Sequence, residues 1–229
     1  MTTRYLLKKI KLSESDLEEI KNSVGKAESK TSGEIALALT AESDSYSFWE
    51  LLSSIYIAAT VFVILLPFAD SIYNFYEQHY WNIGNQVLPA FYGAAIFISI
   101  TAAFFAMNIP FLDRIIIPKS VQKSKVTAKA FEHFAKFGVH ETAGHSGILI
   151  FVSYLERQVR IIADSGIAKK IPQDLWNIIA DDLADGIKTG NTKEGFINAV
   201  EKCGELLYEN FPAESDNPNE LADGLVILN

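Results

Sequence analysis

Two long stretches without a charged residue constrain this chain more than any other feature of its sequence. The first runs from Leu51 to Ala69 and the second from Trp81 to Leu112. A helix needs roughly 20 apolar residues to cross the hydrocarbon core of a bilayer, and each stretch meets that length. We therefore predict a transmembrane helical hairpin at residues 48–112. Two buried core helices are the alternative, but a run of 32 uncharged residues is too long for ordinary globular packing.

The residues that border the two stretches support this interpretation. Aromatic rings favour the headgroup region of a bilayer, and prolines are tolerated near the ends of a span. Near the predicted span ends lie Trp49, Tyr80, Trp81 and Tyr92, together with Pro67, Pro89 and Pro110. The N-terminal sequence is charged throughout and has no apolar run of signal-peptide length. The first stretch is therefore expected to act as an internal anchor.

The distribution of basic residues predicts the orientation of the hairpin. The connection from Asp70 to Tyr80 contains no lysine or arginine. The segment after the second stretch contains five, namely Arg114, Lys119, Lys123, Lys125 and Lys129. Because basic residues accumulate on the cytoplasmic side, we expect both termini in the cytoplasm and the short connection outside.

Charge and cysteine content limit the partners. The net charge of −8 argues against nucleic acid, which basic patches bind. The one cysteine, Cys203, excludes an intrachain disulfide and is expected to pack on an apolar helix face. The bilayer and a membrane-protein partner are the partners that we expect.

The polar sequence on both sides of the hairpin predicts one split α/β domain. Ser13 and Asp16 form a capping-box pattern at the start of a helix that ends at Ser32-Gly33. Further helices are expected from Pro118 to Gly138, after Pro172, and after Asn191, which pairs with Glu194 as a cap. Strands are predicted at 34–40, at 147–152 and, antiparallel to the second, at 159–163. The alanines of the first strand would let a helix pack closely on one face.

Because the first strand cannot bury its faces alone, one sheet must take strands from both sides of the hairpin. The predicted organisation has four parts, which are 1–47 and 113–212 as two pieces of one domain, 48–112 as the hairpin, and 213–229 as an acidic tail. The tail is expected to have little structure before Leu225–Leu228.

The order of these elements, and several motifs, resemble the TPM domain family, and most closely its bacterial membrane-anchored branch with a hairpin inserted in the domain. The matching motifs are Thr31-Ser-Gly-Glu-Ile35, His140-Glu-Thr142, Ser146–Ser153, Glu156-Arg157, Ile162–Ile167, Glu194-Gly-Phe196 and Phe211-Pro212. The resemblance implies a small mixed sheet flanked by helices and a place in the bacterial inner (plasma) membrane. It associates relatives with assembly or repair of membrane complexes, weak acid phosphatase activity and calcium binding.

No complete catalytic constellation is found in the sequence. His140 and His145 are five residues apart with Gly144 between them, whereas the zinc motif needs two histidines four apart on one helix. Ser165-Gly166 and Thr189-Gly190-Asn191 are too short for a phosphate-binding loop. A helix that carries Asp181, Asp182 and Asp185 offers an acidic surface, which is a solvated face or a partner surface.

The topology predicts one cluster that could carry chemistry. If the first two strands are parallel, their N-terminal ends meet the end of the third strand, which would gather Glu34, His140, Glu141, His145, Asp164 and Ser165. Glu34, Glu141 and Asp164 are then candidate ligands for a divalent cation such as calcium, because hard cations prefer carboxylate oxygens. The alternative is surface charge with a structural turn at Asp164.

These observations predict a non-enzymatic interaction or assembly module at the cytoplasmic face of the membrane. The second hypothesis is a weak metal-assisted phosphatase or other hydrolase that holds a metal through Asp164 and Glu34. A transport path through the spans is the weakest hypothesis, because neither stretch contains an ionisable residue.

Overall fold

The computed structural model describes residues 3–80, 84–107, 109, 112, 115–142, 144–213 and 219–228, and it divides the chain into two units. One unit combines Met1–Asp44 with Ser120–Asn229, and the other is Ser45–Lys119. Trp81, Pro110, Arg114 and residues 214–218 of the predicted tail lie outside the described residues.

The unit Ser45–Lys119 is helical. It contains α3 (Ser47–Leu65), the 3-10 turn η1 (Leu66–Phe68), α4 (Ala69–His79) and α5 (Val87–Met107). α3 packs along α5. The rings of Phe62 and Tyr92 meet edge to face at 5.5 Å, and the Tyr92 hydroxyl donates to the carbonyl of Leu65 at 3.1 Å. Pro67 lies in η1, where α3 ends.

Two stretches of this unit are long and apolar enough to cross a membrane, by length and composition. They are Ser47–His79, whose most apolar 18 residues have a mean hydropathy of 2.3, and Val87–Met107, whose most apolar 18 residues have a mean hydropathy of 1.9. The first of them includes α4, so the segment that we expected to connect the two spans continues as a helix.

The other unit is built on a four-stranded mixed sheet in the order β3-β2-β1-β4. The strands are β1 (Glu34–Thr40), β2 (Gly147–Ser153), β3 (Gln158–Ala163) and β4 (Leu225–Leu228). β1 runs parallel to β2, from Glu34 opposite Gly147 to Thr40 opposite Ser153. β3 runs antiparallel to β2, and β4 runs parallel to β1. The predicted fold class, a small mixed sheet flanked by helices, is therefore confirmed.

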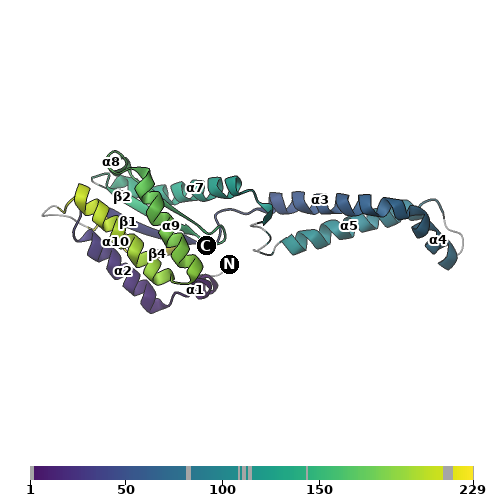
Figure 1. Cartoon of the computed structure of the whole chain (residues 1–229), viewed down its shortest axis with the longest axis horizontal. Helices are drawn as coiled ribbons and strands as arrows, with labels where there is room; N and C mark the ends of the chain where they lie inside the picture. The colour runs from purple at the N-terminus through teal and green to yellow at the C-terminus, as the bar shows by residue number, and fades with distance from the viewer. Residues whose placement is uncertain are drawn as a thin grey trace. The chain divides into compact units, whose positions relative to one another are not determined.

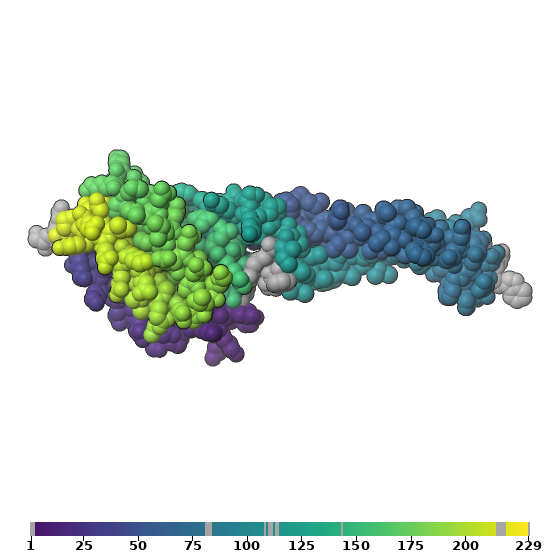
Figure 2. Space-filling view, in the orientation of Figure 1, coloured from purple at the N-terminus to yellow at the C-terminus, as the bar shows by residue number. Residues whose placement is uncertain are grey.

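Helices cover both faces of this sheet (Figure 1). One face packs against α1 (Thr3–Ile10), α2 (Glu14–Glu28), α9 (Gln173–Thr189) and α10 (Thr192–Asn210). Figure 2 shows α9 and α10 covering this side of the sheet. The other face packs against α7 (Lys119–Lys136) and the short turn η2 (Val139–Glu141).

The sequence of β1 explains why its two faces differ. Ile35, Leu37 and Leu39 point to the face that α2, α9 and α10 cover. Ala36 and Ala38 point to the other face, where the cluster includes Val126 and Ala130 of α7. The expectation that the alanines admit a closely packed helix is confirmed.

The helix ends follow local chemistry, with one exception. The capping box of Ser13 and Asp16 is present at the start of α2. Gly138, two residues after the end of α7, adopts a left-handed conformation with φ of 67°. The predicted capping by Asn191 and Glu194 is wrong, because the Asn191 side chain makes no capping hydrogen bond at the start of α10.

One helix was not expected from the sequence, and one strand lies where the tail was expected to acquire structure. Helix α1 precedes the first predicted helix and buries Leu6 and Ile10 against the large core cluster. Strand β4 forms where the tail was expected to begin acquiring structure, and it pairs with β1 from Leu37 opposite Leu225 to Thr40 opposite Leu228. The central position of β1 therefore depends on the last residues of the chain.

Candidate functional site

The predicted cluster corresponds to the N-terminal ends of β1 and β2. Glu34 lies opposite Gly147 in the register, and its N–H donates to the Ser146 carbonyl at 3.1 Å. The N–H of Asp164, which follows β3, donates to the Gly147 carbonyl at 2.9 Å. The sheet therefore brings the backbones of Glu34 and Asp164 to one end, as the topology predicts.

Glu34 is buried, with 2% of its surface exposed, and its carboxylate binds the C-terminal segment of the chain. Its Oε2 atom accepts the N–H of Leu221 at 3.2 Å. Burial raises the pKa of Glu34 above its usual value, and the charges of Glu220 and Asp223 raise it further, against the backbone hydrogen bonds that lower it. This carboxylate is thus a backbone acceptor that anchors residues 219–223 beside the sheet.

Glu28 is a second buried carboxylate at this end, and our sequence interpretation missed it. Its Oε1 atom accepts the N–H of Ile35 at 2.7 Å, while Oε2 has no hydrogen-bond partner among the described residues. Burial raises the pKa of Glu28 to about 8, and the charges of Glu34 and Asp223 act in the same direction. A signal existed, because Ile20, Val24 and Glu28 are spaced four apart on the buried face of α2.

Asp164 has a local structural role. It precedes the short helix α8 (Ser165–Ala168), and its Oδ1 atom accepts the Ser165 N–H at 2.5 Å. Its Oδ2 atom lies 3.0 Å from Nδ1 of His145, a residue in a left-handed conformation. Both oxygens of the Asp164 carboxylate therefore hold the chain around β3 and α8 in place.

Glu141 is exposed on η2, with its Oε1 atom 3.7 Å from Nε2 of His140. Together with Glu220 and Leu221 it lines a hollow of about 240 Å³. Glu34, Glu141 and Asp164 thus lie at one end of the unit but contact different groups. Within the residues that the structure describes, no three His, Cys, Asp or Glu side chains form a group that could hold a metal ion.

The other residues named from the sequence have structural surroundings. Cys203 is fully buried in the large core cluster, as expected for a packing residue, and burial raises the pKa of its thiol. On the acidic face of α9, Asp182 forms an ion pair of 2.6 Å with Lys202 of α10. Both Asp182 and Lys202 are largely exposed, so this pair contributes little to stability.

The role of Glu34 as an anchor gives a testable expectation. Glu34→Ala removes the acceptor of the Leu221 N–H, so backbone amides in residues 219–228 should exchange with solvent at least about fivefold faster, since leaving a buried N–H without an acceptor costs on the order of 1–3 kcal/mol. Hydrogen exchange followed by mass spectrometry of the full chain measures this. Glu34→Gln keeps an oxygen acceptor and should exchange like the wild type; equal acceleration in both variants would contradict the assignment.

Comparisons with known proteins agree with this architecture. The family model described as the TPM domain matches residues 114–206, so the chain carries a TPM domain, as the resemblance implies for this part of the chain. The fold is similar to that of the BA42 protein from the psychrophilic bacterium Bizionia argentinensis, solved by NMR, with a TM-score of 0.54, 18% identity and coverage of 94% of each chain. No curated protein matches the chain.

Proposed function

We propose that this TPM-domain protein is anchored in a bacterial inner membrane by a helical hairpin at residues 48–112, with both termini in the cytoplasm. One observation carries the proposal. In the most apolar windows of Ser47–His79 and Val87–Met107, only 11% and 6% of the residues are buried inside the structure. A core helix of a soluble protein would be mostly buried, whereas lipid would cover the exposed apolar side chains of these helices.

The part that contains the TPM domain would serve as an interaction or assembly module for a membrane-protein partner. The carboxylates at the N-terminal end of the sheet argue against the alternative of a hydrolase that holds a metal there, because Glu28, Glu34 and Asp164 each accept a backbone N–H of their own chain. Carboxylates held in this way maintain structure and are poorly placed to act on a substrate.

Cysteine labelling in intact cells tests the anchor and its orientation. Cys203 is buried and its thiol pKa is raised, so it should give no background. Gln78→Cys, in the exposed end of α4, should react with a membrane-impermeant maleimide in intact cells. Glu209→Cys, exposed near the end of α10, should react only after the cells are permeabilised.

The unsubstituted chain is the control for these variants and should remain unlabelled in both conditions. Labelling of the cysteine at position 209 in intact cells would contradict the orientation, and recovery of the chain in the soluble fraction would contradict the anchor. The assembly role is tested separately by affinity purification of the full chain from uncharged detergent. Failure to recover any reproducible membrane-protein partner would count against that role.

A further inference from the structure

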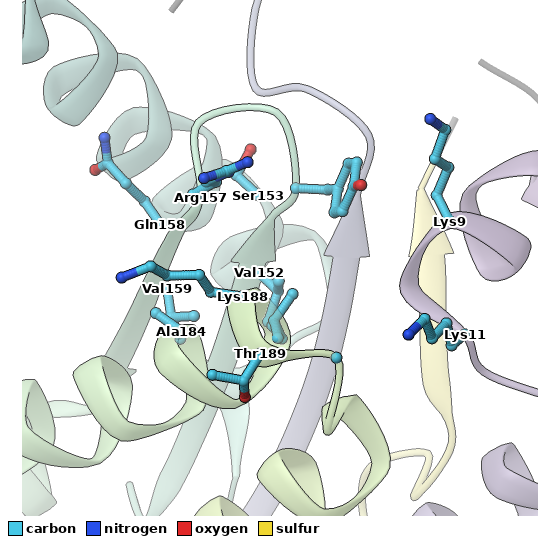
Figure 3. Close-up of a pocket in the computed structure, with 13 residues that line it drawn as sticks. Lys9, Lys11, Val152, Ser153, Arg157, Gln158, Val159, Ala184, Lys188 and Thr189 are labelled. Carbon is cyan, nitrogen blue, oxygen red and sulfur yellow. The ribbon is translucent and has the colours of Figure 1, made fainter. Parts of the chain in front are cut away.

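A pocket of about 230 Å³ opens at the other end of the sheet, by the last residues of β2 (Figure 3). Its walls come from α1 and the turn after it, from the β2–β3 turn, and from the C-terminal end of α9. None of the carboxylates described above takes part in it.

The polar lining of the pocket is unusually basic for an acidic chain. Lys9, Lys11, Arg157 and Lys188 line it, and no aspartate or glutamate does. Figure 3 shows Lys9 and Lys11 on one side and Arg157 and Lys188 on the other. The chain as a whole has 28 acidic and 20 basic residues, so this concentration of cations runs against its composition.

The four basic side chains of the pocket make few ion pairs or hydrogen bonds with other described residues of the protein. Among the described residues, no ion pair or hydrogen bond involves the side chains of Lys11 or Arg157, and Lys9 only lies over the ring of Tyr5 at 5.6 Å. Lys188 lies 3.6 Å from Asp185, with both side chains largely exposed. Lysines elsewhere on this unit, such as Lys125 and Lys193, form ion pairs with carboxylates. An anion in the pocket would therefore meet cations that have no strong competing partner.

The backbone at two of these residues is also unusual. Lys11 and Arg157 have positive φ angles of 57° and 52°, and His145 is the only other non-glycine residue of this kind within the described ranges. Left-handed backbone favours glycine, asparagine and aspartate, so lysine and arginine are costly choices here. Such residues cluster at ligand sites, where the side chain has a use. Gly190 leaves room for Lys11, whose Nζ lies 3.2 Å from the place of a Cβ at that glycine.

The rest of the lining is mixed, with the polar side chains of Ser153, Gln158 and Thr189 beside an apolar wall. Val152 and Val159 are buried, and Ala184 and Ile187 of α9 complete this wall. The pocket therefore suits a ligand that combines an anionic group with a small organic part, rather than a bare ion.

We propose that this pocket binds the phosphate group of a glycerol-sized phosphoester. The ligand would be either a soluble sugar or glycerol phosphate or the headgroup of an anionic phospholipid. The lipid source rests on the proposed membrane insertion. Ser153 of the pocket pairs with Thr40, and six residues separate Thr40 from Ser47, where α3 begins. Because an extended residue spans at most about 3.5 Å, the chain between Thr40 and Ser47 can reach no more than about 25 Å.

Calorimetric titration of the full chain with glycerol phosphate, in nanodiscs of phosphatidylcholine, tests the proposal. The wild type should bind saturably, and the double variant Lys11→Asn/Arg157→Asn should bind at least about tenfold more weakly. Asparagine tolerates positive φ, so this variant should fold as well as the wild type, and its Tm verifies that. The control Lys21→Gln/Lys169→Gln removes two exposed cations outside the pocket and should bind within about twofold of the wild type.

A second titration, in nanodiscs that contain phosphatidylglycerol, distinguishes the two sources. Weaker binding of glycerol phosphate by the wild type there than in phosphatidylcholine nanodiscs would show that lipid occupies the pocket. Unchanged binding would assign the pocket to a soluble phosphoester. Absence of saturable binding in phosphatidylcholine nanodiscs, or equal loss in the two double variants, would overturn the proposal. A chain that proves soluble can be titrated without nanodiscs, so failure of the anchor and failure of the pocket are separable.

Discussion

At pH 8, Glu28→Gln should raise the free energy of unfolding by about 4 kcal/mol over the wild type, while at pH 5 the two proteins should differ by less than about 1 kcal/mol. Burial raises the pKa of Glu28 to about 8 from 4.5, so the folded protein holds a proton that the unfolded chain releases. Each pKa unit between the two states corresponds to about 1.4 kcal/mol. Glutamine keeps the acceptor for the Ile35 N–H and removes the charge.

The sign follows from proton binding. Between about pH 5 and pH 8 the folded state binds more protons than the unfolded state, so the stability that Glu28 contributes is present at low pH and is lost as the pH rises. Urea unfolding of the full chain in an uncharged detergent across this range measures it. The pKa of Glu34 is also raised, so the variant should keep part of the slope. Glu18→Gln, exposed on the same helix, should follow the wild type, and parallel profiles for Glu28→Gln and wild type would contradict the prediction.

Phe151→Ala should lower the free energy of unfolding by about 3–5 kcal/mol, because it removes a fully buried ring from a central strand and leaves a cavity. Phe151 stacks near His133 at 6.1 Å and packs in the cluster that joins the sheet to α7. The same urea titration, at one pH, measures the loss. Phe131→Ala makes the same chemical change at a ring of α7 that is 55% exposed, and its effect should stay within about 0.5 kcal/mol. Similar losses in the two variants would show that α7 packs differently.

Strands β1, β2 and β3 could be predicted because their apolar residues follow patterns that are typical of buried strands. The predicted limits of β1, residues 34–40, are those of the structure, and β2 and β3 differ from the prediction by one residue at one end. The continuous apolar run in β2 and the alternation in β1 leave few other arrangements that bury both. The parallel pairing of β1 with β2 was a condition of the predicted cluster rather than a prediction from these patterns, and the structure shows it.

Helix α1 was missed, and the pairing of β4 was not predicted, because neither has a sequence signal of that strength. Strand β4 has only four residues, and its pairing with β1 spans nearly the whole chain. Helix α1 has eight residues, which alone are too few for a stable helix, and its burial of Leu6 and Ile10 depends on tertiary packing. Asn191 is a residue type that is favoured at the N-cap of a helix. In the structure, however, its side chain makes no capping hydrogen bond at the start of α10.

The candidate sites, too, could be predicted from the sequence only in part. Topology from the sequence was enough to bring Glu34 and Asp164 to one end of the sheet, but not to show which atoms their oxygens contact. Glu28 could have been found from its helical spacing. The basic pocket could not, because its cations come from three separate segments and the positive φ angles of Lys11 and Arg157 leave no mark in the sequence.

The position of β1 between β2 and β4 in the sheet also determines when its edges can be paired during synthesis. Both neighbours of β1 are made after the helices α3 and α5, and the second neighbour, β4, comes from the last residues of the chain. A ribosome therefore releases β1 long before either of its edges can be paired. Unpaired apolar strand edges are prone to aggregate while they wait. Nascent β1 therefore exposes two unpaired apolar edges until β2 and then β4 have been made.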